Sequence, residues 1–286
     1  MRVFSVFNYT LLLFVALLCL FPLWHILAVS FSSSSAAAAG LVTFWPVQFT
    51  TKSYEFILAK PEFLRSMAVT LQRLVIGSVI NMLLTIIIAY PLSKESKDLK
   101  FRTVYAWFFI FTILFGGGLI PAYMTIKYVG LLNSIWALVL PSAVPVFNII
   151  LLLNFFRGLP KELEESAFMD GAGYWTVLWR IYVPISLPAM ATVGLFTMVG
   201  HWNAWFDGLI YMSTPDQYPL ASYLQTIIKG IDLTKMTGQD ALTMAEVSDR
   251  TAKAAQIFVG TLPILLVYPF LQRFFVQGIV LGSVKE

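Results

Sequence analysis

The residues best suited to binding chemistry lie in one short run: His201-Trp202-Asn203-Ala204-Trp205-Phe206-Asp207. The flat apolar faces of Trp202 and Trp205 could cover the C–H face of a sugar ring, while Asn203 and Asp207 could bond its hydroxyl groups. Tryptophans also form belts at membrane interfaces, which is a simpler explanation of the two indole rings. The polar groups of His201, Asn203 and Asp207 are harder to explain in that way, because a belt does not require them.

A second polar set recurs every three or four residues, which places its members on one face of a helix: Ser66, Thr70, Arg73, Gly77, Asn81 and Thr85. We expect that face to point into a bundle of helices. The alternative for Arg73 is that its long side chain reaches toward a membrane interface. Further along, Pro141 and Pro145 predict a kinked helix that also carries Asn148. The residues predicted to line a substrate path are Arg73, Asn81, Asn148, His201, Trp202, Asn203, Trp205 and Asp207.

The composition predicts that the elements holding these residues are membrane helices. The chain has 286 residues, of which 58% are hydrophobic and 12% charged, and its mean hydropathy is +0.79. So much apolar surface cannot be kept from water by folding alone. Lipid offers no partner for backbone polar groups, and the alternation typical of barrel strands is missing, so we expect an all-α membrane protein.

Apolar runs of about 20 residues can each cross a hydrocarbon core about 30 Å thick. Six spans are predicted, at approximately Asn8–Ser30, Ser66–Leu92, Thr103–Ile126, Ser134–Phe156, Pro184–Met212 and Gln256–Ile279. Basic residues concentrate in the short loops that hold Lys94 to Arg102 and Arg157 to Arg180, which favours a cytoplasmic side for these loops and for both termini. A cleaved signal peptide is the alternative for the N-terminus, but its apolar stretch is too long for a usual signal core.

A charged island, residues 157–183, separates the fourth and fifth predicted spans. Pro160 suits a first helical position, and the glutamates that follow favour the positive end of a helix dipole. The helix should stop at Gly171 or Gly173, and a second helix should run from Tyr174 to Tyr182, before a break at Pro184. Such a helix pair could dock on another protein, or it could lie on the membrane surface as an ordinary amphipathic pair.

The island carries a specific resemblance. Glu165-Ser166-Ala167, then Gly171, then Ile181, Val183 and Pro184 resemble the cytoplasmic "EAA" loop of permease subunits in binding-protein-dependent ABC importers. Ser166 stands where the usual motif has alanine, and Val183 where it has leucine. Nearly the whole chain is similar to the smaller permease of maltose-type carbohydrate importers. The resemblance implies the type I ABC importer permease fold, in a single transmembrane domain over residues 1–286.

The resemblance also implies partners and roles. The loop would dock on an ATPase subunit through a set of coupling residues: Glu165, Ser166, Ala167, Asp170, Gly171, Ile181 and Pro184. The chain would work in a bacterial cell membrane with a second permease as a heterodimer, two ATPase subunits that use ATP and Mg, and an extracytoplasmic solute-binding protein. That protein would deliver an oligosaccharide to the outer loop at residues 213–255, which as plain sequence could instead be a surface cap. No nucleic-acid partner is expected.

No catalytic or metal-binding residue is predicted in the chain itself, and no cofactor. Gly116-Gly117-Gly118 lacks the lysine and hydroxyl residue of a phosphate-binding loop, as expected for a subunit that borrows ATP hydrolysis. Cys19 is the only cysteine, and His25 and His201 are the only histidines, so neither a disulfide nor a membrane enzyme is favoured. An autonomous secondary transporter or channel is the main alternative, although the spans contain few acidic residues for ion coupling.

Overall fold

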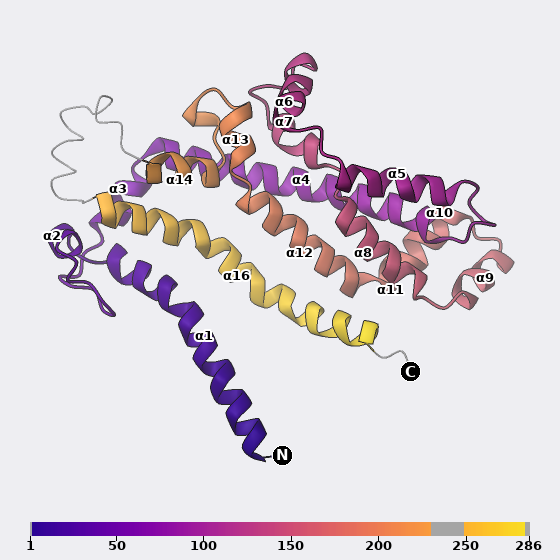
Figure 1. The fold of residues 1–286 in the computed structure, drawn as a ribbon, viewed down its shortest axis with the longest axis horizontal. Coiled ribbons are helices and arrows are strands. Elements are labelled where there is room, and N and C mark those ends of the chain that lie inside the picture. The colour runs from indigo at the N-terminus through magenta and orange to yellow at the C-terminus, as the bar shows by residue number, and fades with distance from the viewer. Residues whose placement is uncertain (1, 230–248, 284–286) are drawn as a thin grey trace. The chain divides into compact units, whose positions relative to one another are not determined.

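A computed structural model of the chain describes residues 2–229 and 249–283, and this part of the chain is helical, without β-strands. The helices drawn in Figure 1 are α1 Arg2–Ser30, α2 Ser34–Ala38, α3 Lys52–Leu58, α4 Pro61–Ser93, α5 Arg102–Leu114, α6 Leu119–Tyr128, α7 Ile135–Val139, α8 Val146–Arg157, α9 Glu162–Met169, α10 Tyr174–Val177, α11 Val183–Ile185, α12 Leu187–Asn203, α13 Phe206–Tyr211, α14 Leu220–Lys229 and α16 Asp249–Ser283. Two 3₁₀ turns, Leu140–Ser142 and Pro215–Gln217, and one π-helical segment, Leu178–Tyr182, complete them.

The chain divides into two compact units. Unit 1 comprises residues up to Met67 together with Leu220–Pro263, and unit 2 comprises Ala68–Pro219 and the chain from Ile264 onward. In unit 1, small buried side chains around Ala28, Ala37 and Ala254 form the core, and Arg250 donates to the carbonyl of Ala37 at 3.1 Å. All the residues predicted to bind a substrate or a partner ATPase belong to unit 2.

Unit 2 is built around three neighbouring helices, α4, α8 and α12 (Figure 1). Its core contains buried apolar side chains from all three, such as Ile86, Leu152 and Val193. The predicted polar face of α4 does point inward, since Thr70, Arg73, Asn81 and Thr85 are each no more than 3% exposed. Polar groups at this depth must find partners inside the protein, because lipid supplies none.

By length and apolar composition, α1 and α4 can each cross a membrane, and three pairs of shorter helices can do so if each bent pair is one span. The third predicted span, Thr103–Ile126, is such a pair, α5 and α6, bent by 111°. Three successive glycines, Gly116 to Gly118, cause the break, and Gly118 has a φ of +86° that other residues rarely adopt. The fourth span bends by 46° between α7 and α8, which confirms the kink expected from Pro141 and Pro145.

In the fifth predicted span, Pro184–Met212, the structure differs from the prediction in two places. Its long helix, α12, begins at Leu187, and a second break at Ala204 and Trp205 separates it from α13. The helix before it continues through Pro184 to Ile185, so the prediction of a break at Pro184 is wrong, and the axis turns by 82° between Ile185 and Leu187. Pro184 follows a π-helical turn, where the hydrogen-bond ladder that a proline would interrupt is already altered.

The charged island forms α9 and α10 as expected, with one shift at its start. Lys161 is the N-terminal cap of α9 and Glu162 its first residue, so Pro160 lies before the helix and not in its first turn. The expected stop is confirmed, because Gly171 takes a left-handed φ of +81° just after α9 ends. In the predicted outer loop, residues 213–255, the structure places α14 and the start of α16, while residues 230–248 lie outside the described part of the chain.

Candidate functional site

The break between α12 and α13 exposes a backbone acceptor inside unit 2. In a continuous helix, the carbonyl of Ala204 would accept from the backbone N–H of Gly208. Here the N–H of Gly208 donates instead to Oδ1 of Asp207 at 2.9 Å, and Nη1 of Arg73 donates to the Ala204 carbonyl at 3.3 Å. The broken helix therefore provides part of the binding site for a guanidinium group on α4.

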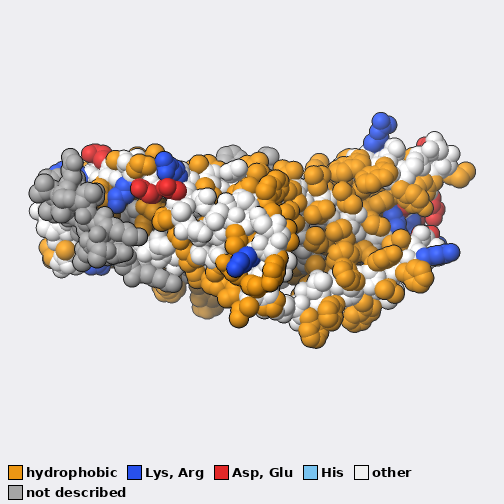
Figure 2. All heavy atoms as spheres, turned by 90° about the horizontal axis from the view of Figure 1, so that it is seen from above, with side chains coloured by type: hydrophobic (Ala, Val, Ile, Leu, Met, Phe, Trp, Pro, Cys, Tyr) orange, Lys and Arg blue, Asp and Glu red, His pale blue; other side chains and the backbone are white. Residues whose placement is uncertain are grey.

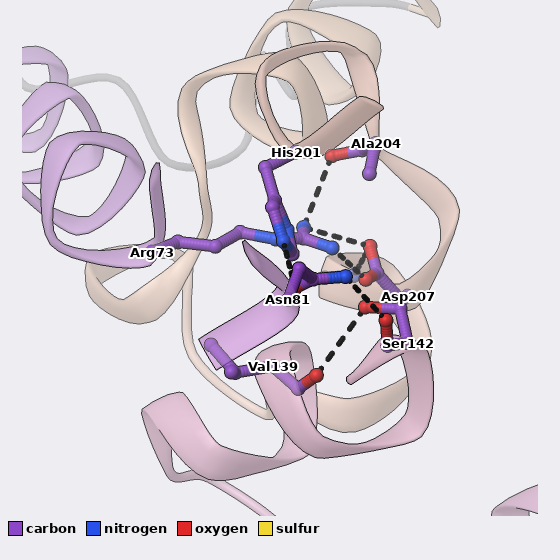
Figure 3. Close-up of polar contacts among 8 residues, drawn as sticks. Arg73, Asn81, Val139, Ser142, His201, Ala204 and Asp207 are labelled. Carbon is purple, nitrogen blue, oxygen red and sulfur yellow. Dashed lines mark hydrogen bonds and ion pairs between the residues drawn. The ribbon is translucent and has the colours of Figure 1, made fainter. Parts of the chain in front are cut away.

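Arg73 and Asp207 form an ion pair across the unit (Figure 3). Nη1 donates to Oδ1 of Asp207 at 3.1 Å, and Nη2 donates to Oδ2 of the same carboxylate in a very short contact. The Arg73 side chain is only 2% exposed, and that of Asp207 is 26% exposed. Arg73 therefore does not extend to a membrane interface, because a carboxylate 134 residues away in the chain neutralises it inside the protein.

A second polar chain links α4 to α12 and to the 3₁₀ turn after α7 (Figure 3). Asn81 donates to the carbonyl of Ser142 at 2.7 Å, and its Oδ1 lies 3.0 Å from Nε2 of His201. Since Oδ1 can only accept, Nε2 of His201 carries the proton in this arrangement. Asn148 makes a parallel link by donating to the hydroxyl of Thr197 at 3.0 Å.

Gly77 permits the close approach of α4 and α12. A Cβ atom placed on Gly77 would lie 2.5 Å from Nε2 of His201 and within 2.9 Å of two carbon atoms of the same ring. Any side chain at position 77 would therefore displace the imidazole from Asn81. The glycine is needed for this packing contact, and not for a turn.

These polar groups line a cavity of about 320 Å³. Its volume falls at the lower end of the range typical of small-ligand sites. The lining residues are Arg73, Asn81, Ser142, Pro145, Asn148, Phe196, Thr197, Gly200, His201, Ala204 and Asp207. One cation and one carboxylate lie among uncharged hydrogen-bonding groups, so the wall can bind hydroxyl groups without carrying a net charge.

Five of the eight predicted path residues line this cavity: Arg73, Asn81, Asn148, His201 and Asp207. The other three, Trp202, Asn203 and Trp205, do not line it. Trp202 is 7% exposed and so is covered by protein, whereas Asn203 and Trp205 are exposed, which leaves an interfacial belt possible for Trp205. Thr197 was missed, although it precedes His201 by four residues and so shares its helix face.

The predicted coupling residues lie on or beside α9, at the end of α4 opposite to α13 (Figure 1). Glu165, Ser166, Asp170, Gly171 and Pro184 are exposed, while Ala167 and Ile181 are half-buried against the core of unit 2. Met169, in the last turn of α9, is 88% exposed. Hydrophobic side chains cover much of the face drawn in Figure 2, and charged side chains are visible toward both ends, including the right-hand end, where α9 lies.

A buried charge cluster that sequence reasoning missed lies directly behind α9. Nζ of Lys94 donates to both carboxylate oxygens of Glu164, at 2.7 and 2.6 Å, and the hydroxyl of Tyr182 donates to Oε2 at 2.7 Å. Burial lowers the pKa of Lys94, an effect that the bond to Glu164 opposes. Burial, with the adjacent Glu164 carboxylate, raises the pKa of Tyr182, so its hydroxyl remains a donor.

A cavity of about 710 Å³ opens beside this cluster and is lined by charged side chains that include Arg102, Arg157 and Glu165. Within the described residues, no group of three or more histidine, cysteine, aspartate or glutamate side chains could hold a metal ion.

Comparison with known proteins agrees with this geometry. Protein LplC of Bacillus subtilis (strain 168) is 41% identical over 99% of this chain and 95% of its own length. The polygalacturonan/rhamnogalacturonan transport system permease protein YtcP of the same organism is 38% identical over 99% of both chains. A chain in the crystal structure of a bacterial ABC transporter involved in the import of the acidic polysaccharide alginate superimposes with a TM-score of 0.87. It is 32% identical, over 96% of this chain and 97% of that one.

The fold shared with the alginate transporter chain and the bent apolar helices both fit a membrane component of a transport system. The family model that describes the binding-protein-dependent transport system inner membrane component matches residues 74–281. This match covers most of unit 2, including α9 and every cavity-lining residue except Arg73. The chain therefore belongs to the family of inner membrane components of binding-protein-dependent ABC transport systems.

Proposed function

We propose that the chain is the permease subunit of an ATP-driven importer and that it carries an oligosaccharide through unit 2 by alternating access. The observation that carries the proposal is the cavity of about 320 Å³ between α4, α8 and α12, because it gathers polar groups from three membrane helices around a neutralised charge pair. Polar groups at membrane depth are costly and commonly mark a solute path. The names of two relatives, which concern pectic polysaccharides and alginate, support a saccharide substrate.

The acidic class of oligosaccharide is favoured within this proposal. Both relatives with a named polysaccharide handle one that contains uronic acids or is called acidic. Arg73 is the only Lys or Arg side chain among the described residues that line the cavity, and its Nε has no partner among them. A uronate carboxylate could share the guanidinium with Asp207, because arginine binds carboxylates in a planar fork.

The partners follow from the family. The subunit would pair with a second, different permease, dock two ATPase subunits that use ATP and Mg, and receive substrate from a solute-binding protein outside the cell. Residues 157–183 would form the ATPase-docking loop and residues 213–255 would face the binding protein, with both termini in the cytoplasm. The exposed Glu165, Ser166 and Asp170 support docking at α9, where a partner can reach them.

The test uses the complete complex in proteoliposomes with its binding protein. Uptake of trigalacturonate and of maltotriose is compared in the presence of ATP and Mg. Transport of trigalacturonate in preference to maltotriose supports the acidic class, and equal transport contradicts it. Uptake that proceeds without nucleotide would contradict the importer itself.

Docking at α9 is tested by Glu165→Lys, with Glu95→Gln as a control because Glu95 is exposed and lies outside residues 157–183. We expect Glu165→Lys to insert normally and to lose most ATP-dependent uptake, since a reversed charge at a docking surface opposes a partner's complementary charge. Normal uptake by the Glu165→Lys complex would show that the ATPase docks elsewhere.

A further inference from the structure

The cluster formed by Lys94, Glu164 and Tyr182, hereafter the latch, joins three parts of unit 2. Lys94 directly follows α4, Glu164 belongs to α9, and Tyr182 ends the π-helical segment before α11. The Lys94 ammonium donates to Glu164 and also to the Tyr182 hydroxyl, the latter at 3.1 Å. It lies 4.0 Å from the ring centre of Tyr90 and 4.3 Å from that of Tyr182, within the range of cation–π attraction.

The latch forms part of the wall of the cavity of about 710 Å³, but little of its surface is exposed. The side chains of Lys94 and Glu164 are 9% and 15% exposed. The rings of Tyr90, Phe156 and Tyr182 meet edge to face around it, with centroids 5.0 to 6.5 Å apart. An ion pair in such a place is weakly screened by salt, and removing one partner leaves the other charge buried and uncompensated.

The latch is also the main buried polar contact of α9. No residue of α9 is fully buried, and Ala167 is only half-buried against the core of unit 2, so apolar burial contributes little to holding this helix in place. Its other ion pair in the described chain joins Lys161, at the N-terminal cap, to Glu95, but those two side chains are 69% and 46% exposed. Exposed pairs of this kind contribute little to stability.

Helix α4 connects the latch to the cavity of about 320 Å³. Arg73 and Asn81 lie on α4, the helix that ends at Ser93, directly before Lys94. An α-helix rises about 1.5 Å per residue, so about 30 Å of helix separates Arg73 from Lys94. Pro91 removes one hydrogen bond close to the end of α4, and the aromatic rings around Lys94 hold that last turn against α8 and the π-helical segment.

We propose that Lys94, Glu164 and Tyr182 are positioning residues that fix α9 to the end of α4, so that a displacement of α9 by a bound ATPase reaches the cavity through α4. This inference rests on the proposed function, because it assumes that α9 is the ATPase-docking helix. The latch residues touch neither nucleotide nor transported solute in this assignment. They determine how much of the movement at α9 arrives at Arg73 and Asn81.

The test measures the number of sugar molecules moved per ATP hydrolysed. It uses the complete complex in proteoliposomes with its binding protein, and trigalacturonate or maltotriose as the sugar, whichever the wild type transports. We expect Lys94→Met and Glu164→Gln to lower this ratio about tenfold while the complex still binds its ATPase subunits, because either change leaves a buried group unpaired. The exchanged pair Lys94→Glu with Glu164→Lys should recover part of the ratio. Glu95→Gln, which breaks the exposed pair between the same two segments from outside the docking loop, should change it less than about twofold.

Tyr182→Phe keeps the aromatic ring and removes one hydrogen-bond donor, so a complex with this variant should assemble even where one with Lys94→Met does not. It should lower the ratio of sugar moved to ATP hydrolysed about threefold, as expected for one lost hydrogen bond to a charged group. The inference is overturned if Tyr182→Phe and every assembled variant of Lys94 or Glu164 keep the wild-type ratio. A wild-type complex that moves sugar without hydrolysing ATP would overturn the proposed function. If the wild-type complex couples transport to ATP hydrolysis and the latch variants do so equally well, only the role assigned to the latch is overturned.

Discussion

The two ion pairs near opposite ends of the α4 segment in unit 2 differ in what surrounds them. Arg73 and Asp207 face a cavity, share backbone partners at the break after α12, and leave the Nε of Arg73 without a partner among the described residues. Lys94 and Glu164 also line a cavity, of about 710 Å³, but the rings of Tyr90, Phe156 and Tyr182 pack around them and the Tyr182 hydroxyl bonds to both. The Arg73–Asp207 pair can therefore exchange partners with a ligand, whereas the Lys94–Glu164 pair keeps its partners within the protein.

The largest effect should come from breaking the cavity pair on one side only. Asp207→Asn leaves Arg73, which is 2% exposed, without its counter-charge, and we expect the free energy of unfolding to fall by about 3 kcal/mol. Replacing both residues, by Arg73→Met with Asp207→Leu, should recover most of this loss because no charge is then left buried. Thermal unfolding of the detergent-purified complex measures both, and equal losses in the single and double variants would contradict a paired role.

The sequence predicted the members of this pair but not the pairing. Arg73 and Asp207 were each placed on a solute path from their depth and chemistry, yet they are 134 residues apart, and local spacing carries no information about such a contact. The inward face of α4 was predictable from its three-to-four-residue period. The break at Ala204 was not, because Ala204-Trp205 contains neither glycine nor proline, and the break depends on Arg73 and Asp207 taking over the freed backbone groups.

The latch was missed for a related reason. Lys94 was assessed only as a basic loop residue that sets orientation, and Glu164 only as a charge favourable to a helix start. A lysine and a glutamate 70 residues apart in a charged region normally point to solvent, and only tertiary packing of Tyr90, Phe156 and Tyr182 removes them from water. The bend at Gly116 to Gly118 could have been predicted, since three glycines together destabilise a helix.

A packing change should distinguish the cavity end from the latch end. Gly77→Ala places a methyl group within 2.9 Å of three atoms of the His201 ring, so we expect a loss of about 1–3 kcal/mol in stability and a displaced imidazole. Gly200→Ala is the matched control, because no atom lies within 4 Å of its added Cβ. Thermal unfolding is measured for both, and equal stability of the two variants would show that α4 and α12 do not pack closely.

The turn after α9 offers a smaller change near the latch. Gly171 has a φ of +81°, so Gly171→Ala should cost about 1 kcal/mol in stability through backbone strain. Gly173, two residues later, has a negative φ and open space around it, and Gly173→Ala should cost less. Thermal unfolding of the two variants makes the comparison, and a greater loss for Gly173→Ala would contradict the assigned turn.

The smallest effect should come from the exposed pair. Hydrogen bonds from Lys161 and Lys97 lower the pKa of Glu95 below its ordinary value of 4.5. A lowered carboxylate pKa gives a stabilisation that is present above the ordinary pKa and is lost as the pH falls through the folded value. This stabilisation is present at neutral pH, but the side chains are exposed and physiological salt screens the pair, so Glu95→Gln should leave the melting temperature nearly unchanged. A clear drop would mean that α9 depends on this pair as well as on the latch.

Helix α1 has a practical consequence for anyone who handles the subunit. Only 11% of its apolar span is buried, and its leucines and phenylalanines from Phe4 to Phe21 remain mostly uncovered by the rest of the described chain. An exposed apolar helix of this length self-associates in aqueous buffer. Purification must therefore supply a substitute for lipid from the first extraction onward, as a detergent belt, a nanodisc or the remaining subunits of the assembly.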